Sequence, residues 1–153
     1  MAKKSETTTP VVARKLALFL VLFYIIYYVL SIILVGAFGV EWTRLGGFPF
    51  RTAMSEFNPK AGGGALGAWL AMVITYVLSL LLAYYVVRAT KRTWDYMITT
   101  SFIHWVICCL VNQQFPVNWI WWVTLIIATI LVSVAAEFAI YFLRDLKEIE
   151  LDH

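Results

Sequence analysis

The chain has 153 residues, of which 62% are hydrophobic and 16% aromatic, and its mean hydropathy is +0.82. This composition excludes an ordinary soluble domain, in which about half of the residues are apolar and about a quarter are charged. The net charge of +3 does not indicate nucleic-acid binding, because the basic residues are spread along the chain rather than gathered in one stripe.

The first half of the chain predicts two transmembrane helices. The first, residues 16–38, is uncharged and longer than the roughly 7 to 15 residues of a cleaved signal core, so we expect a retained signal anchor. The second, residues 66–87, follows the glycine run 62–64, which we interpret as a hinge leading into the span. Between them, the aromatic loop 39–65 is expected to fold back on the membrane surface.

The second half predicts two more spans, residues 94–111 and 119–143, joined by a polar elbow. Residues 96–136 contain no Asp, Glu, Lys or Arg. A charged side chain at mid-bilayer costs about 2.5 kcal/mol or more, so an uncharged run of this length is typical of two membrane crossings with a tight turn. The sequence therefore predicts an all-α membrane protein, a bundle of four transmembrane helices.

The placement of the basic residues predicts the topology. Of the 12 Lys and Arg residues, three lie in loop 39–65, none lies in the elbow, and the others lie in 1–15, 88–92 and 144–153. Because short cytoplasmic segments retain positive charge, both termini are predicted to be cytosolic and loop 39–65 lumenal. The organisation is then a cytosolic segment 1–15, a membrane domain 16–143 and a cytosolic tail 144–153.

Aromatic residues are expected to mark the two membrane interfaces, where amphipathic rings favour the headgroup layer. Trp119, Trp121 and Trp122 would lie at the lumenal interface, and Trp94 and Tyr96 at the cytosolic one.

Glu137 is the sharpest candidate for a functional side chain. It lies six residues from the cytosolic end of the fourth span, about 9 Å inside it at 1.5 Å per residue. A carboxylate at this depth is functional or critical for packing. Three interpretations remain open: a shallow carboxylate bonded to the headgroups or a neighbouring helix, a partner-binding group, and a proton or ion pathway. Asp95 is expected on the same cytosolic side.

His104 and Cys108 share one face of the third span, four residues apart. A neutral imidazole near mid-membrane usually bonds across helices. We reject a metal site, because structural zinc needs four ligands and the chain offers no third and fourth nearby. Cys108 and Cys109 are adjacent in an apolar segment and do not form a disulfide framework.

No catalytic constellation is present in the sequence: there is no plausible Ser/His/Asp set, no phosphate-binding glycine motif and no pair of intramembrane carboxylates. We therefore predict a protein that is not an enzyme and needs no cofactor. Small residues form a stripe along the fourth span and favour close helix packing, mostly within the bundle: Thr124, Ala128, Ala135 and Ala139.

A series of residues resembles the Sys family, the integral membrane protein S linked to the trans-Golgi network. In chain order the series is Trp94-Asp95-Tyr96, Thr99, His104, Phe115-Pro116, Trp121-Trp122, Glu137 and Leu146-Lys147-Glu148-Ile149. Residues 21–28 and 48–52 look more like the transmembrane protein 244 branch of the same family.

The resemblance implies a four-span protein of the trans-Golgi network that recruits an acetylated ARF-related small GTPase, acting in Golgi vesicle trafficking and protein targeting to the Golgi. Another endomembrane is the alternative location. We expect partner contact through Asp95, Glu137 and the tail edge of Leu146, Lys147, Glu148 and Ile149. Internal packing is expected of His104, Phe115, Pro116, Trp121 and Trp122.

Two other functions stay open at this point. One is a structural subunit of a larger membrane complex, assembled through the small-residue stripe. The other, less favoured, is a small transporter or proton pathway through His104 and Glu137, two groups at different depths. Homo- or hetero-oligomers are compatible with each of these functions.

Overall fold

The protein is an all-α bundle, seen here in a computed structural model that describes residues 9–87 and 93–151, with side chains for 10–87 and 93–142. Its helices are α1 (Thr9–Ala37), α2 (Gly63–Leu82), α3 (Thr93–Asn112) and α4 (Trp119–Leu151). A 3₁₀ helix, η1 (Trp42–Phe50), lies in the long connection, and a π-helix, η2 (Ala83–Val87), continues α2. Within these described residues, four helices are long and apolar enough to cross a membrane, as predicted.

The helices do not end where the apolar segments end. Helix α1 begins at Thr9 rather than at residue 16, and so includes Arg14 and Lys15. Helix α2 begins at Gly63, and α4 continues past residue 143 to Leu151. Backbone hydrogen bonding carries a helix beyond the membrane-compatible residues, whereas hydropathy marks only the apolar part.

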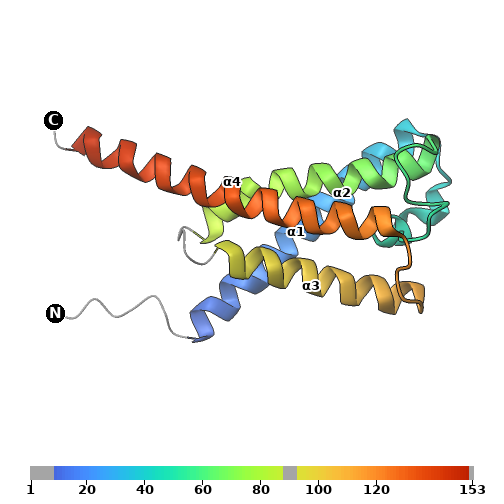
Figure 1. The fold of residues 1–153 in the computed structure, drawn as a ribbon, viewed down its shortest axis with the longest axis horizontal. Coiled ribbons are helices and arrows are strands. Elements are labelled where there is room, and N and C mark those ends of the chain that lie inside the picture. The colour runs from blue at the N-terminus through green and yellow to red at the C-terminus, as the bar shows by residue number, and fades with distance from the viewer. Residues whose placement is uncertain (1–8, 88–92, 152–153) are drawn as a thin grey trace.

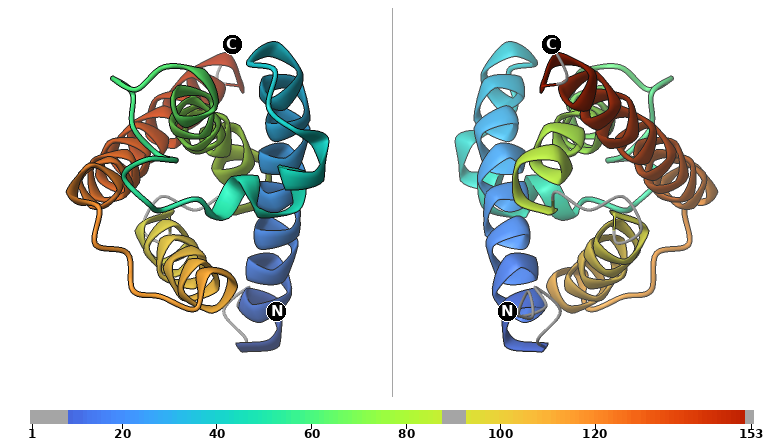
Figure 2. Two further views of the ribbon diagram at one scale, coloured as in Figure 1. Left: turned by 90° about the vertical axis from the view of Figure 1, so that its right-hand side faces the viewer. Right: turned by 90° about the vertical axis from the view of Figure 1, so that its left-hand side faces the viewer.

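The four helices surround a common centre in the order α1, α2, α4, α3 (Figure 2). Helix α1 packs mainly on α2, α2 on α4, and α3 on α4, while the backbones of α1 and α3 lie farther apart and are bridged by side chains. Helix α1 begins and α4 ends at one end of the bundle, here called the terminal end, and the last turns of α4 project beyond the other helices there (Figure 1). The opposite end, called the loop end, carries η1 and the elbow 113–118.

The α1–α2 interface joins large aromatic side chains to small ones. Helix α1 buries Phe19, Phe23 and Tyr27, which recur every four residues and so lie on one face. Helix α2 presents small buried residues to the bundle interior: Ala68, Ala71, Thr75 and Ser79. Water does not drive helix association within a bilayer, and small residues allow the two helices to approach closely. Phe23 also packs edge-on against Tyr76 of α2, with centroids 5.4 Å apart.

Loop 39–65 enters the bundle rather than folding back on the membrane surface. Its residues Phe48, Pro49 and Phe50 are buried under the helix ends. The Tyr28 hydroxyl donates to the Gly46 carbonyl at 3.0 Å, which fixes η1 against α1. The three phenylalanines of the loop, Phe48, Phe50 and Phe57, therefore belong to the core, which corrects the expectation from sequence for this part of the loop, whereas Trp42 is 60% exposed.

The glycine run is a helix start that requires glycine. Gly62 and Gly63 have φ of 71° and 50°, in the left-handed region that other residues rarely adopt. A Cβ on Gly64 would lie 2.8 Å from Cγ2 of Val40. The run thus turns the chain and lets the loop approach α2 closely.

Candidate functional site

The carboxylate of Glu137 is bound by a tryptophan at the terminal end. The indole Nε1–H of Trp94, in the first turn of α3, donates to Oε2 of Glu137 on α4 at 2.8 Å. Both side chains are half-buried. Since a carboxylate inside a span needs a donor, this bond explains how Glu137 is tolerated there. Sequence reasoning placed Trp94 at the interface and missed this partnership.

Asp95, the other predicted acidic contact, lies beside this pair but points elsewhere. It is in the first turn of α3 and its side chain is exposed. An acidic residue in a first helical turn interacts favourably with the helix dipole. Of the two described carboxylates at the terminal end, Glu137 is therefore held in the bundle and Asp95 is exposed.

Tyr96 is buried rather than interfacial, contrary to expectation. Its ring packs edge-on against Phe19 of α1, with centroids 6.1 Å apart, and its hydroxyl donates to the Val12 carbonyl at 3.4 Å. It lies on the same buried face of α3 as Thr100, four residues on. Tyr96 therefore links α3 to α1 at the terminal end.

An aromatic face on α4 adjoins Glu137. Phe138, Tyr141 and Phe142 are all more than half exposed, and the rings of Phe138 and Phe142 are stacked with centroids 6.4 Å apart. Beyond them α4 continues to Leu151. The side chains of the tail edge, Leu146, Lys147, Glu148 and Ile149, lie outside the described residues.

His104 is fully buried at the centre of an aromatic cluster. Its Nδ1 lies 3.2 Å from the Tyr24 hydroxyl and its Nε2 lies 3.6 Å from Sγ of Cys108. Five rings surround the imidazole at centroid distances of 5.6 to 6.4 Å: Phe23, Tyr24, Tyr27, Phe50 and Trp121. These rings come from α1, η1 and α4, so His104 of α3 joins every element except α2 and η2.

Cys108 is in contact with His104, and the two side chains do not belong to a larger cluster of potential metal ligands among the described residues. In the part of the chain that the structure describes, no group of three or more His, Cys, Asp or Glu side chains could hold a metal ion. The contact fits the predicted bonding and packing role of the imidazole.

A chain of hydroxyls crosses the bundle interior. The Tyr76 hydroxyl of α2 lies 2.9 Å from Oγ of Ser101 on α3, which lies 2.6 Å from Oγ1 of Thr129 on α4. Thr129 also donates to the Leu125 carbonyl at 2.7 Å. Such interhelical hydrogen bonds stabilise packing where no water is available. Nothing in the sequence marked these three residues, because each is a common, uncharged type.

At the loop end, two asparagines of the elbow region hold the long loop in place. Asn112 donates through Nδ2 to the Phe50 carbonyl at 2.7 Å, and Asn118 donates through Nδ2 to the Phe57 carbonyl at 2.8 Å. Asn118 also accepts the backbone N–H of Ile120 at 3.0 Å through Oδ1, as a helix N-cap does. The polarity of the elbow is therefore structural.

The aromatic residues of the elbow region differ in burial. Trp121 is buried against His104, Pro116 is buried, and half-buried Trp122 donates to the Pro116 carbonyl at 2.8 Å. Phe115 is 61% exposed although internal packing was expected, because its ring lies on the outer side of Trp105 and Trp122. Trp119 is also exposed, so it alone of its cluster has the position expected of an interfacial tryptophan.

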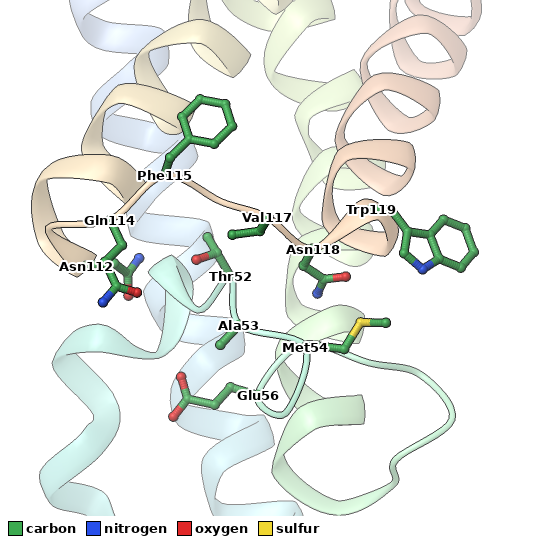
Figure 3. A pocket seen from close by; sticks show the side chains of 10 residues that line it. All are labelled: Thr52, Ala53, Met54, Glu56, Asn112, Gln114, Phe115, Val117, Asn118 and Trp119. Carbon is green, nitrogen blue, oxygen red and sulfur yellow. The ribbon is translucent and has the colours of Figure 1, made fainter.

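A cavity of ≈ 520 Å³ lies between the loop and the elbow (Figure 3). The polar residues Thr52, Glu56, Asn112, Gln114 and Asn118 line it together with a more apolar set: Ala53, Met54, Phe115, Val117 and Trp119. In Figure 3 the carboxylate of Glu56 and the amides of Asn112 and Gln114 lie on one side, and the side chains of Met54 and Trp119 on the other. Sequence reasoning did not identify this cavity, because its walls come from segments more than fifty residues apart.

Arg51 borders the neighbouring part of the loop. Its guanidinium lies over the Phe48 ring, 4.8 Å from the centroid. Burial lowers the pKa of Arg51 from its usual value, and the Glu56 carboxylate acts in the opposite direction. Among the described residues Glu56 forms no ion pair, whereas exposed Glu41 pairs with Arg44 at 3.2 Å.

The comparison with known families decides what kind of protein this is. Residues 3–151 match the family described as "Integral membrane protein S linking to the trans Golgi network". This chain belongs to the SYS1 family. It is therefore an integral membrane protein of the trans-Golgi network, and its four spans agree with that assignment.

A relative of this SYS1-family chain is the protein SYS1 homolog of Nematostella vectensis. The two are 28% identical over 82 residues, which cover 54% of this chain and 51% of the relative. The chain thus matches about half the length of that curated relative. No solved structure matches the present chain.

Proposed function

We propose that this SYS1-family protein recruits an ARF-related small GTPase with an acetylated N-terminus to the trans-Golgi network membrane. The observation that carries the proposal is the terminal end, where the Trp94–Glu137 pair adjoins the exposed aromatic rings of α4. Family membership supplies the location, and this surface supplies a place to dock.

The chemistry of the partner fits such a surface. Acetylation removes the charge of the terminal amine. An amphipathic N-terminal helix would then place its apolar face on Phe138, Tyr141 and Phe142 at membrane depth. A single weak anchor binds membranes only marginally, so a protein receptor provides the second signal that makes the attachment stable.

The predicted topology is part of the proposal. With both termini cytosolic, as the distribution of Lys and Arg predicts, the terminal end faces the compartment in which the GTPase is found. Asp95, Glu137 and the tail edge Leu146–Ile149 are then the proposed contacts, and His104 supports the bundle from within.

Co-purification of the acetylated GTPase with the full chain from Golgi membranes tests the proposal. We expect recovery with the native chain and with Glu41→Gln, which changes a loop-end carboxylate. We expect losses of about tenfold with Glu137→Ala and with Phe138→Ala, the size of a removed interface anchor. Equal recovery with both terminal-end variants and with a chain lacking residues 144–153 would refute the site, and no recovery with the native chain would refute the function.

A second function, a structural subunit of a larger membrane complex, has one observation in its favour. In the small-residue stripe of α4, Thr124 is held internally by the Trp69 indole at 3.1 Å, but Ala135 is exposed. The stripe is therefore open to another helix at Ala135, whereas Ala139 is half-buried. Ala135→Leu would remove a stoichiometric membrane partner in mild detergent if this function holds.

A further inference from the structure

The polar wall of the loop-end cavity presents hydrogen-bond acceptors. Both amide hydrogens of Asn112 are used, one on the Phe50 carbonyl at 2.7 Å and the other on the Cys108 carbonyl at 2.8 Å. Its Oδ1 therefore remains as an acceptor. Glu56 adds a half-buried carboxylate that, among the described residues, has no ion pair and no side-chain hydrogen bond. A wall of this kind suits a positively charged group that carries N–H donors.

The opposite wall and the mouth of the cavity are apolar. Val117 is 91% exposed, and Phe115, Trp119 and Met54 are also exposed. These residues lie where the α4 span begins, at Trp119. Exposed tryptophan and apolar side chains at the end of a span favour the headgroup layer of the bilayer. The cavity, of ≈ 520 Å³, therefore opens among lipid headgroups and has the size of a small-molecule site.

We propose that this cavity binds the primary ammonium of an aminophospholipid headgroup, that of phosphatidylethanolamine, with Glu56 as counter-ion and Asn112 Oδ1 as a further acceptor. The glycerol end of the lipid lies over Met54 and Trp119. The proposal is independent of GTPase recruitment, because the cavity lies at the loop end and the docking surface at the terminal end (Figure 1).

The acceptor-rich wall selects ethanolamine over choline. A primary ammonium donates three N–H bonds, whereas a quaternary ammonium donates none and leaves the acceptors unpaired on binding. The Arg51 charge interacts with the Glu56 carboxylate, but among the described residues Arg51 forms no ion pair with it, lies over the Phe48 ring and does not line the cavity. The Glu56 oxygens thus remain available to the headgroup.

The test is native mass spectrometry of the full chain in mild detergent, titrated with dihexanoyl phosphatidylethanolamine or dihexanoyl phosphatidylcholine. The native chain is expected to bind the ethanolamine lipid about tenfold more tightly, the size of one charge-assisted hydrogen bond. Glu56→Gln is expected to abolish this preference. Glu41→Gln, which changes a loop carboxylate outside the cavity, should keep it.

Loss of folding is not expected to explain the result. The Glu56 side chain makes no hydrogen bond among the described residues, so the Glu56→Gln variant should unfold under the same conditions as the native chain. A native chain without headgroup preference, or a Glu56→Gln variant that retains it, overturns the proposal. Soluble glycerophosphoethanolamine is the second probe. If glycerophosphoethanolamine binds more weakly than the lipid, the result supports a bilayer lipid as the ligand. If it binds equally tightly, the result overturns the proposal. Binding of a lysine-containing peptide without any lipid preference would show a protein ligand instead, and also overturns it.

Discussion

The indole of Trp94 and the carboxylate of Glu137 lie 43 residues apart in sequence and are joined by a 2.8 Å hydrogen bond. The bond connects the first turn of α3 to the part of α4 that adjoins its exposed aromatic rings. It fixes a membrane-embedded carboxylate in one direction, so the same contact serves the stability of the bundle and the shape of the proposed docking surface.

Removing the donor should therefore destabilise the bundle. Trp94→Phe keeps a ring but leaves the half-buried Glu137 without its indole partner, and we expect a loss of about 1 to 3 kcal/mol in the free energy of unfolding. Trp119→Phe is the matched control, because Trp119 is exposed and its side chain makes no hydrogen bond among the described residues. Denaturant titration in detergent, followed by circular dichroism, measures both variants. Equal unfolding of the two would show that the Trp94 bond contributes nothing.

The aromatic cluster around His104 makes a second prediction. His104→Ala removes a fully buried ring from among five others, and a cavity of this kind costs about 2 to 5 kcal/mol. Tyr24→Phe removes only the hydroxyl that lies 3.2 Å from Nδ1, and should cost about 1 kcal/mol. Thermal unfolding in detergent measures the order. Tyr141→Phe, a change at an exposed tyrosine, should have no effect, and an equal loss there would contradict the role of the cluster.

The asparagine bonds predict protection of the long loop. Asn118→Ala removes the donor to the Phe57 carbonyl and the N-cap of α4, so the loop segment around the exposed Lys60 should open locally more often for protease cleavage. We expect trypsin cleavage after Lys60 to accelerate about tenfold, the effect of losing roughly 1.4 kcal/mol of local stability. Gln114→Ala, in the same elbow but exposed, is the control. Cleavage that accelerates equally in both variants would show that the Asn118 hydrogen bonds do not protect the loop.

Two helical glycines should respond oppositely to alanine. A Cβ on Gly67 of α2 would lie 2.9 Å from Cδ2 of Phe38, so Gly67→Ala should lose about 1 kcal/mol through overpacking. A Cβ on Gly36 of α1 would meet the Trp42 ring at an ordinary 3.6 Å. Gly36→Ala should gain about 0.5 kcal/mol from helix propensity. Unfolding in detergent compares the pair, and a gain at Gly67 would show that Phe38 moves aside freely.

Part of the candidate site could be predicted from the residues. Glu137 was singled out because a carboxylate within a span is costly wherever the helix faces, and the cost is a property of the residue and its depth. Its partner Trp94 was not found, because an indole at a span boundary has an equally good explanation as an interfacial anchor. Tyr96 was misplaced for the same reason. Burial depends on the rotation of α3, and the weakly amphipathic sequence of that helix does not specify its rotation.

The sequence by itself determined the four membrane-spanning helices, because the cost of placing charge in hydrocarbon acts on each segment separately. Only the tertiary structure decided that Phe50 enters the bundle beside His104, that Trp94 binds Glu137, and that Glu56 shares a cavity with Asn112. Each of these contacts joins residues far apart in the chain. They depend on how the apolar helices rotate and pack against one another, and side-chain shape sets that packing rather than hydropathy.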